Sequence, residues 1–194
     1  PAIGGIAKGV VAREVDALGG VMGRATDASR IQFRMSNRSK GPAVWGPRAQ
    51  CDRNLYPVAV RCVLDELEGL DLFQEMVSDL VLEGGRVTGV RTRGGITFYG
   101  TAVVVTAGTF LRGRIYMGQE AGAGAGRAGE APSIALAEGL ESLGLEMARF
   151  KTGTPPRIDG RSVDFSRVER QDGDDQVIRF AAYTEEIIPA QRPC

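Results

Sequence analysis

The sequence contains no histidine and only three cysteines among its 194 residues. Without histidine, no Ser-His-Asp triad and no imidazole-based zinc site can form. Cys51, Cys62 and Cys194 include no C-x-x-C pair, so we expect neither a disulfide framework nor a thiolate metal site. We therefore predict no bound metal and a cytoplasmic location, and we expect Cys51 and Cys62 to pack rather than react.

Long apolar runs and a signal-like first segment are also missing. The longest purely apolar stretches are a few residues long, as at Val103–Val105, whereas a membrane span needs about 20. Hydrophobic residues make up 43% and charged residues 25%, which is ordinary for a globular protein. Glycine is frequent, with 27 residues, and the sequence starts at Pro1 in a glycine-rich stretch. From this start we expect a segment of a longer protein whose first element lies upstream.

Charge is balanced overall but not along the chain. Residues 1–61 hold ten Lys or Arg and four Asp or Glu, whereas residues 62–85 hold seven acids and no base. A basic first third can face a phosphate-bearing partner, or it can be the ordinary charged surface of helices. Lys40 and Arg48 place part of this charge within residues 39–50, where two prolines and two glycines predict a loop.

Hydrophobic periodicity predicts the secondary structure. We expect helices over residues 8–18, 21–29, 48–67 and 132–143, with Pro57 kinking the third, and strands over 31–35, 70–73, 102–109, 147–150 and 177–182. The helix over 48–67 would place Cys51 and Cys62 on one face. Residues 77–99 predict a three-stranded antiparallel meander, and residues 121–129 (AGAGAGRAG) a flexible loop. The run over 102–109 is typical of a strand buried on both faces of a parallel sheet.

Three short patterns could carry chemistry, and each also has a plain structural explanation. The small residues Thr106–Thr109 can let backbone approach a pyrophosphate, or they can form a tight turn. Gly4, Gly5 and Lys8 can present a helix N-terminus to an anion, or they can cap that helix. Ser133 can contact a phosphate, or it can cap the helix that it starts.

Several longer blocks are more specific. In chain order they are PAIGGIAKG, IQFRMSNRSKGPAVWGPRAQ, TAGTFLRG, GRAGEAPSIALAEGL and ARFKTGTPPRID. Together they resemble the MnmG (GidA) family of tRNA uridine 5-carboxymethylaminomethyl modification enzymes over nearly the whole chain. The resemblance implies an α/β fold, namely part of a glutathione-reductase-type (Rossmann-like) FAD-binding domain with a β-meander and an inserted segment. Residues 1–160 would be the FAD-binding part without its first βαβ unit, and residues 161–194 the polar start of the inserted segment.

The resemblance also implies a function. The family acts as a homodimer with the GTPase MnmE and uses methylenetetrahydrofolate, glycine, FAD and NADH to modify the wobble uridine of tRNA. No catalytic residue of the family falls within this chain, so we expect the chain alone to be inactive, and we expect no membrane association. The residues that match the family's cofactor contacts are Val77, Ser133, Thr106, Gly108, Thr109, Gly4, Gly5 and Lys8.

Three other functions remain open on the sequence. A folate- and FAD-dependent tRNA uridine methyltransferase of the TrmFO type would share the fold. A non-catalytic RNA-binding fragment would explain the basic first third, and a flavoenzyme acting on small molecules would need no tRNA. The chain also departs from the family at Cys51, where alanine is common, and at Pro57, where the family has an uninterrupted helix.

Overall fold

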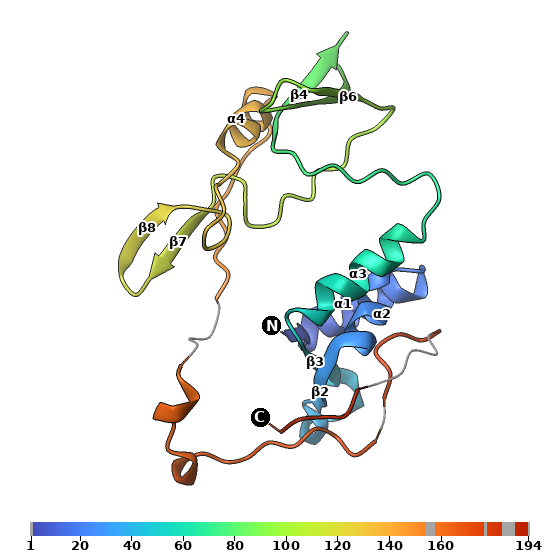
Figure 1. Ribbon diagram of the computed structural model, residues 1–194, viewed down its shortest axis with the longest axis vertical. Coiled ribbons are helices and arrows are strands. Elements are labelled where there is room, and N and C mark those ends of the chain that lie inside the picture. The colour runs from blue at the N-terminus through green and yellow to red at the C-terminus, as the bar shows by residue number, and fades with distance from the viewer. Residues whose placement is uncertain (1, 154–157, 177, 184–188, 194) are drawn as a thin grey trace. The chain divides into compact units, whose positions relative to one another are not determined.

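The computed structural model describes residues 2–153, 158–176, 178–183 and 189–193. The chain forms two compact units (Figure 1). Unit 1 consists of Pro1–Asp71 and Pro156–Cys194, and unit 2 consists of Leu72–Pro155. Both contain helices and strands, so the α/β class is confirmed. The assignment of residues 1–160 to a cofactor-binding domain and of 161–194 to an inserted segment stays a prediction.

Unit 1 is built on a three-stranded antiparallel sheet with the order β1-β3-β2. Its strands are β1 (Ala2–Gly4), β2 (Arg30–Ser36) and β3 (Gly46–Cys51). The helices are α1 (Ile6–Ala17), α2 (Val21–Ser29) and α3 (Leu55–Asp65), and two short 3-10 turns, η1 (Arg38–Lys40) and η2 (Pro42–Val44), join β2 to β3. The predicted first two helices and the strand over 31–35 are therefore confirmed.

The core of unit 1 lies on one face of this sheet. Phe33 of β2 and Ala49 of β3 are buried there with Ala12 of α1 and Phe180. The alternation of apolar and polar residues along β2 produces this face, because successive strand side chains point to opposite sides. Phe180 belongs to the far end of the chain, so residues distant in sequence complete the core.

The predictions for residues 46–57 are wrong in part. The expected loop over 39–50 ends in β3, and the expected helix over 48–67 begins only at Leu55. Pro57 therefore falls in the first turn of α3, where a missing N–H costs no intrahelical bond, and no kink is needed. Cys51 lies on β3 and Cys62 on α3, so the two do not share a helical face.

Unit 2 contains the predicted meander, which the structure confirms. Strands β4 (Val77–Glu83), β5 (Arg86–Thr92) and β6 (Thr97–Tyr99) pair antiparallel in sequence order. Helix α4 (Ile134–Ser142) confirms the helix expected over 132–143 and packs on the meander. Leu80 of β4 and Leu136 and Leu140 of α4 form the buried centre of this contact.

Several other expectations for unit 2 are wrong. The predicted flexible loop begins inside a hairpin of β7 (Arg114–Met117) and β8 (Glu120–Gly124). Residues 70–73, 102–109 and 147–150 form no strand, and Val104 is 83% exposed. A strand is stable only beside a partner that satisfies its backbone groups. Among the described residues, no strand pairs with the run over 102–109.

The last predicted strand, over 177–182, is also wrong where it can be followed. Val177 lies outside the described residues, and residues 178–183 form no strand. Short 3-10 turns, η3 (Gly160–Ser162) and η4 (Phe165–Arg167), are the regular elements described in residues 158–176. Asp174 and Arg192, which come before and after this stretch in the sequence, bond to the edge of β2 instead. The Asp174 amide donates to the Phe33 carbonyl at 2.9 Å, and the Arg192 amide donates to the Ile31 carbonyl at 2.7 Å.

Candidate cofactor site

Three segments of unit 2 meet around the backbone of Ser133. The Ser133 hydroxyl donates to the Val77 carbonyl at 3.4 Å, and the Ser133 amide donates to the Phe110 carbonyl at 2.8 Å. The Arg112 amide donates in turn to the Ser133 carbonyl at 3.1 Å. The start of β4, the start of α4 and the turn after residue 106 are therefore bonded together, and the predicted contacts Val77 and Ser133 touch each other.

The predicted small-residue turn lies at this junction. An amide-to-carbonyl bond of 3.0 Å closes residues 107–110, and Gly108 has a φ of +56°. The Thr109 hydroxyl donates to the Gly126 carbonyl at 2.7 Å. Thr106, Gly108 and Thr109 are exposed, and a Cβ on Gly108 would meet no atom within 4 Å. The turn thus presents open backbone, as a ligand that approaches the main chain closely requires.

Helix α4 begins at the same place without a side-chain cap. Ser133 occupies its N-cap position, as one of the sequence interpretations had it, but makes no capping hydrogen bond. The hydroxyl is used on the Val77 carbonyl instead. The first amides of a helix have no intrahelical partner and carry partial positive charge. The junction therefore suits an anionic group.

An ion pair fixes the turn to α4. Arg112 holds Glu141 with two bonds, Nη1 to Oε1 at 2.6 Å and Nη2 to Oε2 at 2.5 Å. These bonds lower the pKa of the Glu141 carboxyl, because Arg112 donates to its charged form. Arg112 also has a φ of +44°, a conformation that side chains rarely adopt. Sequence reasoning missed this pair, because the partners are 29 residues apart and neither lies in a recognisable pattern.

The remaining predicted contacts lie together in unit 1. Gly4 ends β1 with a φ of +112°, and a Cβ there would lie 2.1 Å from the Pro47 carbonyl oxygen. Gly5 stands at the N-cap of α1, and its amide donates to the same oxygen at 3.0 Å. Lys8 is exposed in the first turn of α1. Residue 4 must be glycine because a side chain there would collide with the backbone of β3. Gly5 lies at the N-cap of α1, which agrees with the capping alternative given for this segment.

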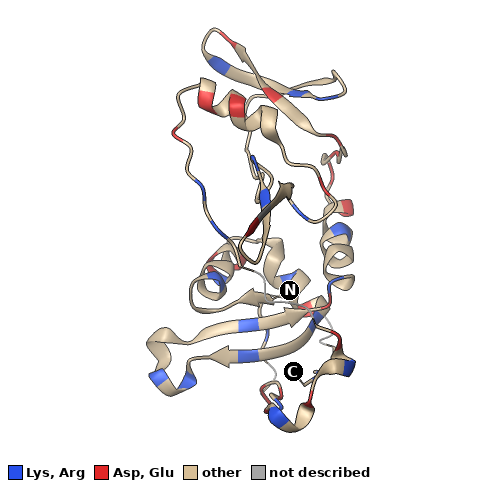
Figure 2. Cartoon of the chain, turned by 90° about the vertical axis from the view of Figure 1, so that its left-hand side faces the viewer, with Lys and Arg blue, Asp and Glu red and all other residues tan. Residues whose placement is uncertain are grey.

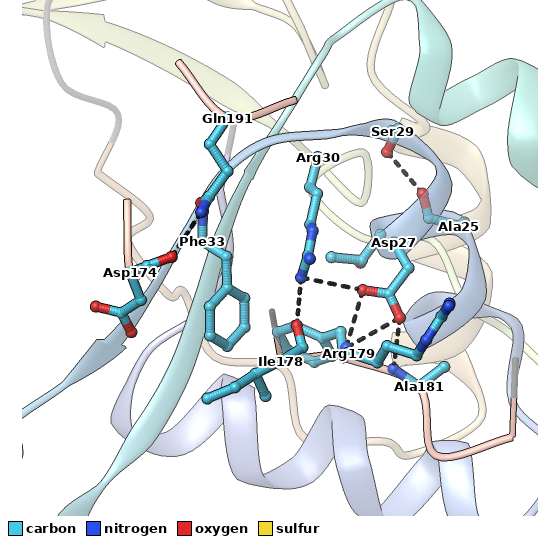
Figure 3. Close-up of polar contacts among 12 residues, drawn as sticks. Ala25, Asp27, Ser29, Arg30, Phe33, Asp174, Ile178, Arg179, Ala181 and Gln191 are labelled. Atoms are coloured by element: carbon cyan, nitrogen blue, oxygen red, sulfur yellow. Dashed lines mark hydrogen bonds and ion pairs between the residues drawn. The ribbon is translucent and has the colours of Figure 1, made fainter. Parts of the chain in front are cut away.

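Unit 1 also holds a buried polar cluster that sequence reasoning missed (Figure 3). The fully buried Asp27 carboxylate accepts from the Phe180 amide at 2.9 Å through each oxygen and from the Ala181 amide at 2.9 Å. Arg30, only 2% exposed, lies with Nη1 3.5 Å from Asp27 and donates to the Ile178 carbonyl. Burial lowers the pKa of the Arg30 guanidinium, and the Asp27 charge opposes that effect.

Neighbouring contacts extend the same attachment. Asp16 Oδ2 accepts from the Ala182 amide at 2.7 Å. Gln191 Oε1 accepts from the Phe33 amide at 2.7 Å, and Asp174 Oδ2 accepts from the Met35 amide at 2.7 Å. Side chains thus satisfy backbone donors of β2 and of residues 180–182, and they hold residues 174, 180–182 and 191 against α1, α2 and β2. We assign this cluster to the integrity of unit 1.

Comparison with known families decides where the chain belongs. A family model described as "Glucose inhibited division protein A" (GidA) matches residues 1–194. The chain belongs to the GidA family. Three curated GidA relatives carry the name "tRNA uridine 5-carboxymethylaminomethyl modification enzyme MnmG". The protein of Thermodesulfovibrio yellowstonii is 53% identical over 194 residues, those of Salinibacter ruber and Geobacter sulfurreducens are 50% identical, and all three matches cover 100% of this chain.

Solved GidA structures agree with this assignment. GidA of Aquifex aeolicus, in two crystal forms, matches this chain with a TM-score of 0.88 and 44% identity over 100% of its length. The match confirms the expected fold, an α/β part of a Rossmann-like GidA domain. This chain spans 31% of the T. yellowstonii protein and 33% of the A. aeolicus chain, which is about a third of the length of its GidA relatives.

GidA is an FAD-binding family, and the unit 2 junction fits that cofactor. It combines an open turn at Gly108, an uncapped helix start at Ser133 and a strand start at Val77, all joined by hydrogen bonds. An anionic dinucleotide needs both backbone donors and room beside them. Within the described part of this GidA chain, no group of three potential ligand side chains could hold a metal ion, and no helix is long and apolar enough to cross a membrane.

The two described cysteines have different environments. Cys51 is buried in the core beside Phe33 and Ala49, and burial raises the pKa of its thiol. The Cys51 side chain therefore packs in the core, as expected, and its raised pKa disfavours the reactive thiolate. Cys62 is exposed on α3, so the expectation that it packs is wrong. Cys194 lies outside the described residues.

Proposed function

We propose that this chain is part of an FAD-dependent enzyme that forms the 5-carboxymethylaminomethyl group on the wobble uridine of tRNA. The support is the family match over residues 1–194, together with about half of all residues shared with three curated MnmG proteins. The names of those relatives specify the modified base and the group added. The GTPase MnmE as partner, a homodimer, and methylenetetrahydrofolate, glycine and NADH as co-substrates belong to this proposal, as does a cytoplasmic location.

Two features of the described residues support the proposed dinucleotide site. The Ser133 hydroxyl at the start of α4 donates a hydrogen bond to the Val77 carbonyl. The exposed turn that contains Thr106, Gly108 and Thr109 is bonded to the same serine through the Phe110 carbonyl. When bound, FAD supplies the redox steps of the modification. This chain's own contribution is to bind the cofactor and set its orientation. We assign Gly4, Gly5 and Lys8 to the segment that approaches the flavin.

We assign no proton transfer and no nucleophile to this chain. Burial raises the pKa of the Cys51 thiol, and the sequence contains no histidine. As the family resemblance implies, the catalytic residues fall outside residues 1–194. We therefore expect the isolated chain to be inactive and to bind FAD weakly.

A chimera tests the proposal. The matching third of T. yellowstonii MnmG is replaced by residues 1–194, and tRNA from a strain carrying only the chimera is digested and measured by nucleoside mass spectrometry. We expect the 5-carboxymethylaminomethyl group at the wobble uridine. Within the chimera, Ser133→Ala should reduce the flavin content of the purified protein, because the tie to Val77 is lost. Ser142→Ala, which removes an exposed hydroxyl at the other end of α4, is the matched control.

The alternatives give different results. A chimera that folds and holds FAD but leaves the wobble uridine unmodified contradicts the proposal. A methylated uridine elsewhere in the tRNA identifies the TrmFO-type methyltransferase instead. Equal flavin content in the Ser133 and Ser142 variants contradicts the assignment of the cofactor site while leaving the modification itself intact.

A further inference from the structure

Two arginines face each other across the centre of the unit 1 sheet. Arg34 on β2 and Arg48 on β3 are direct partners in the antiparallel register, so their side chains leave the sheet on the same face. Side chains in such pairs begin about 4.5–5.5 Å apart. The opposite face carries Phe33 and Ala49 and is covered by α1. The arginines therefore occupy the polar face, away from the core.

No acidic group neutralises this pair. Among the described residues, the side chains of Arg34 and Arg48 make no hydrogen bond and no ion pair, although both residues are partly buried. The acid nearest along the β2 edge, Asp174, is already used by the Met35 amide and by Arg38. Like charges placed directly opposite each other destabilise a sheet. The pair is therefore a local cost that a bound anion would remove.

The residues around the pair leave the face open to such an anion. Across from Arg48, on β1, stands Gly4, which has no side chain to cover it. Gln50 belongs to the next cross-strand pair and is partly exposed, whereas its partner Gln32 is buried and donates through Nε2 to the Gln171 carbonyl at 2.8 Å. Ser36 and Gly46 form the pair on the other side. Neither strand contains an acidic residue, and Figure 2 shows Lys and Arg but no Asp or Glu along this ribbon. The face thus combines two charges with neutral neighbours, and Gln50 and Ser36 are the partly exposed polar groups beside them.

We propose that Arg34 and Arg48 bind a phosphate group, carried by a small molecule or by an RNA backbone. Each guanidinium offers a planar fork of N–H donors. A phosphate monoester or pyrophosphate end has three terminal oxygens and can accept from both forks together. A phosphodiester of an RNA backbone has two non-bridging oxygens, and each can accept from one of the two guanidinium groups. The pair belongs to unit 1, in the sheet that also includes Gly4, whereas the Val77–Ser133 junction belongs to unit 2.

Thermal unfolding of the full chain with and without pyrophosphate tests the site. We expect pyrophosphate to raise the melting temperature of the wild type by mass action. Arg34→Gln and Arg48→Gln should each remove most of that rise. Arg53→Gln, at an exposed arginine on the turn before α3, should keep it. A rise of equal size in all four proteins, or no rise in the wild type with pyrophosphate or RNA, overturns the proposal.

Two further measurements separate binding from folding and identify the source of the phosphate. Without ligand at low salt, the Gln variants should melt at or above the wild-type temperature, because a like-charge contact has been removed. Arg34→Lys, which keeps the charge but not the fork, should bind with intermediate strength. For a labelled RNA stem-loop, each Gln variant should lower the slope of log K against log salt by about 1. Pyrophosphate binding without that change assigns the site to a small-molecule phosphate.

Discussion

Asparagine in place of Asp27 changes one atom of a fully buried side chain and removes its charge. In the wild type both carboxylate oxygens accept from the Phe180 amide, and Oδ2 also accepts from the Ala181 amide. Asparagine has one oxygen and one NH2 group, so at least one backbone N–H would face another donor. Arg30 would also keep its charge, at 2% exposure, without the carboxylate beside it.

The size of the effect follows from these two losses. Removing one partner of a buried ion pair costs about 3–5 kcal/mol, because the remaining charge stays uncompensated. The Arg30 Nε atom already has no hydrogen-bond partner among the described residues, so the site has little capacity to compensate. We expect Asp27→Asn to lower the free energy of unfolding of unit 1 by about 3–5 kcal/mol, a large share of the roughly 5–15 kcal/mol typical of a domain.

Urea unfolding followed by the fluorescence of Trp45, the only tryptophan, measures the stability of unit 1. Hydrogen exchange at the Phe180 and Ala181 amides measures release of the late segment. The matched control is Asp65→Asn, which removes an exposed i,i+4 pair with Arg61 and should cost about 0.3–0.5 kcal/mol. If Asp27→Asn costs no more than the control and leaves both amides protected, the buried carboxylate does not hold the segment.

The other predictions concern the turn, the core thiol and the β1 glycine. Glu141→Gln should speed hydrogen exchange at the Arg112 amide, because Arg112 loses the carboxylate that it holds with two bonds. Glu138→Gln, which removes a nearby charge but no hydrogen bond within the described part of the chain, should have a smaller effect, and equal exchange in both variants contradicts a positioning role for Glu141. Burial raises the pKa of Cys51, so the stability it contributes is complete below the ordinary thiol pKa of about 8.5 and falls as pH rises through the higher folded value. Urea titrations from neutral to alkaline pH should show a shallower loss for Cys51→Ala than for the wild type, and an unchanged slope would refute this. Gly4→Ala should cost about 1–3 kcal/mol or more, since its φ of +112° is strained for alanine and its Cβ would overlap β3; a Trp45-monitored loss below about 0.5 kcal/mol would show that β1 can shift.

Hydrophobic periodicity predicts those helices and strands that bury one face and expose the other, because such burial repeats at the period of the element. The helices α1, α2 and α4, the strand β2 and the meander β4–β6 are of this kind. Residues 46–51 were missed because Gly46 and Pro47 favour a loop, while the pairing of β3 with two other strands depends on residues far away in sequence. The run at 102–109 shows the reverse error. Its composition suits a buried strand, but composition supplies no partner strand.

The candidate site likewise contains residues that could be expected beforehand and contacts that could not. Val77 and Ser133 were each expected at the cofactor only through resemblance to a family, and the structure brings these two residues, 56 positions apart, into contact. The Arg112–Glu141 pair, the Asp27 cluster and the Arg34–Arg48 pair could not be expected from local pattern. Each joins residues whose neighbourhood is set by strand register or by a late segment crossing an early one.

The bonds from Asp27 to the Phe180 and Ala181 amides have a consequence for synthesis on the ribosome. These partners are 153 and 154 residues apart, and unit 2 lies wholly between them in the sequence. The meander of unit 2 uses short-range pairings and can form while the chain is still emerging. Unit 1 can close its core only after Phe180 has been made. Until then Asp27 and Arg30 have no burial partner from the late segment, and the nascent first third must be kept from associating with other chains.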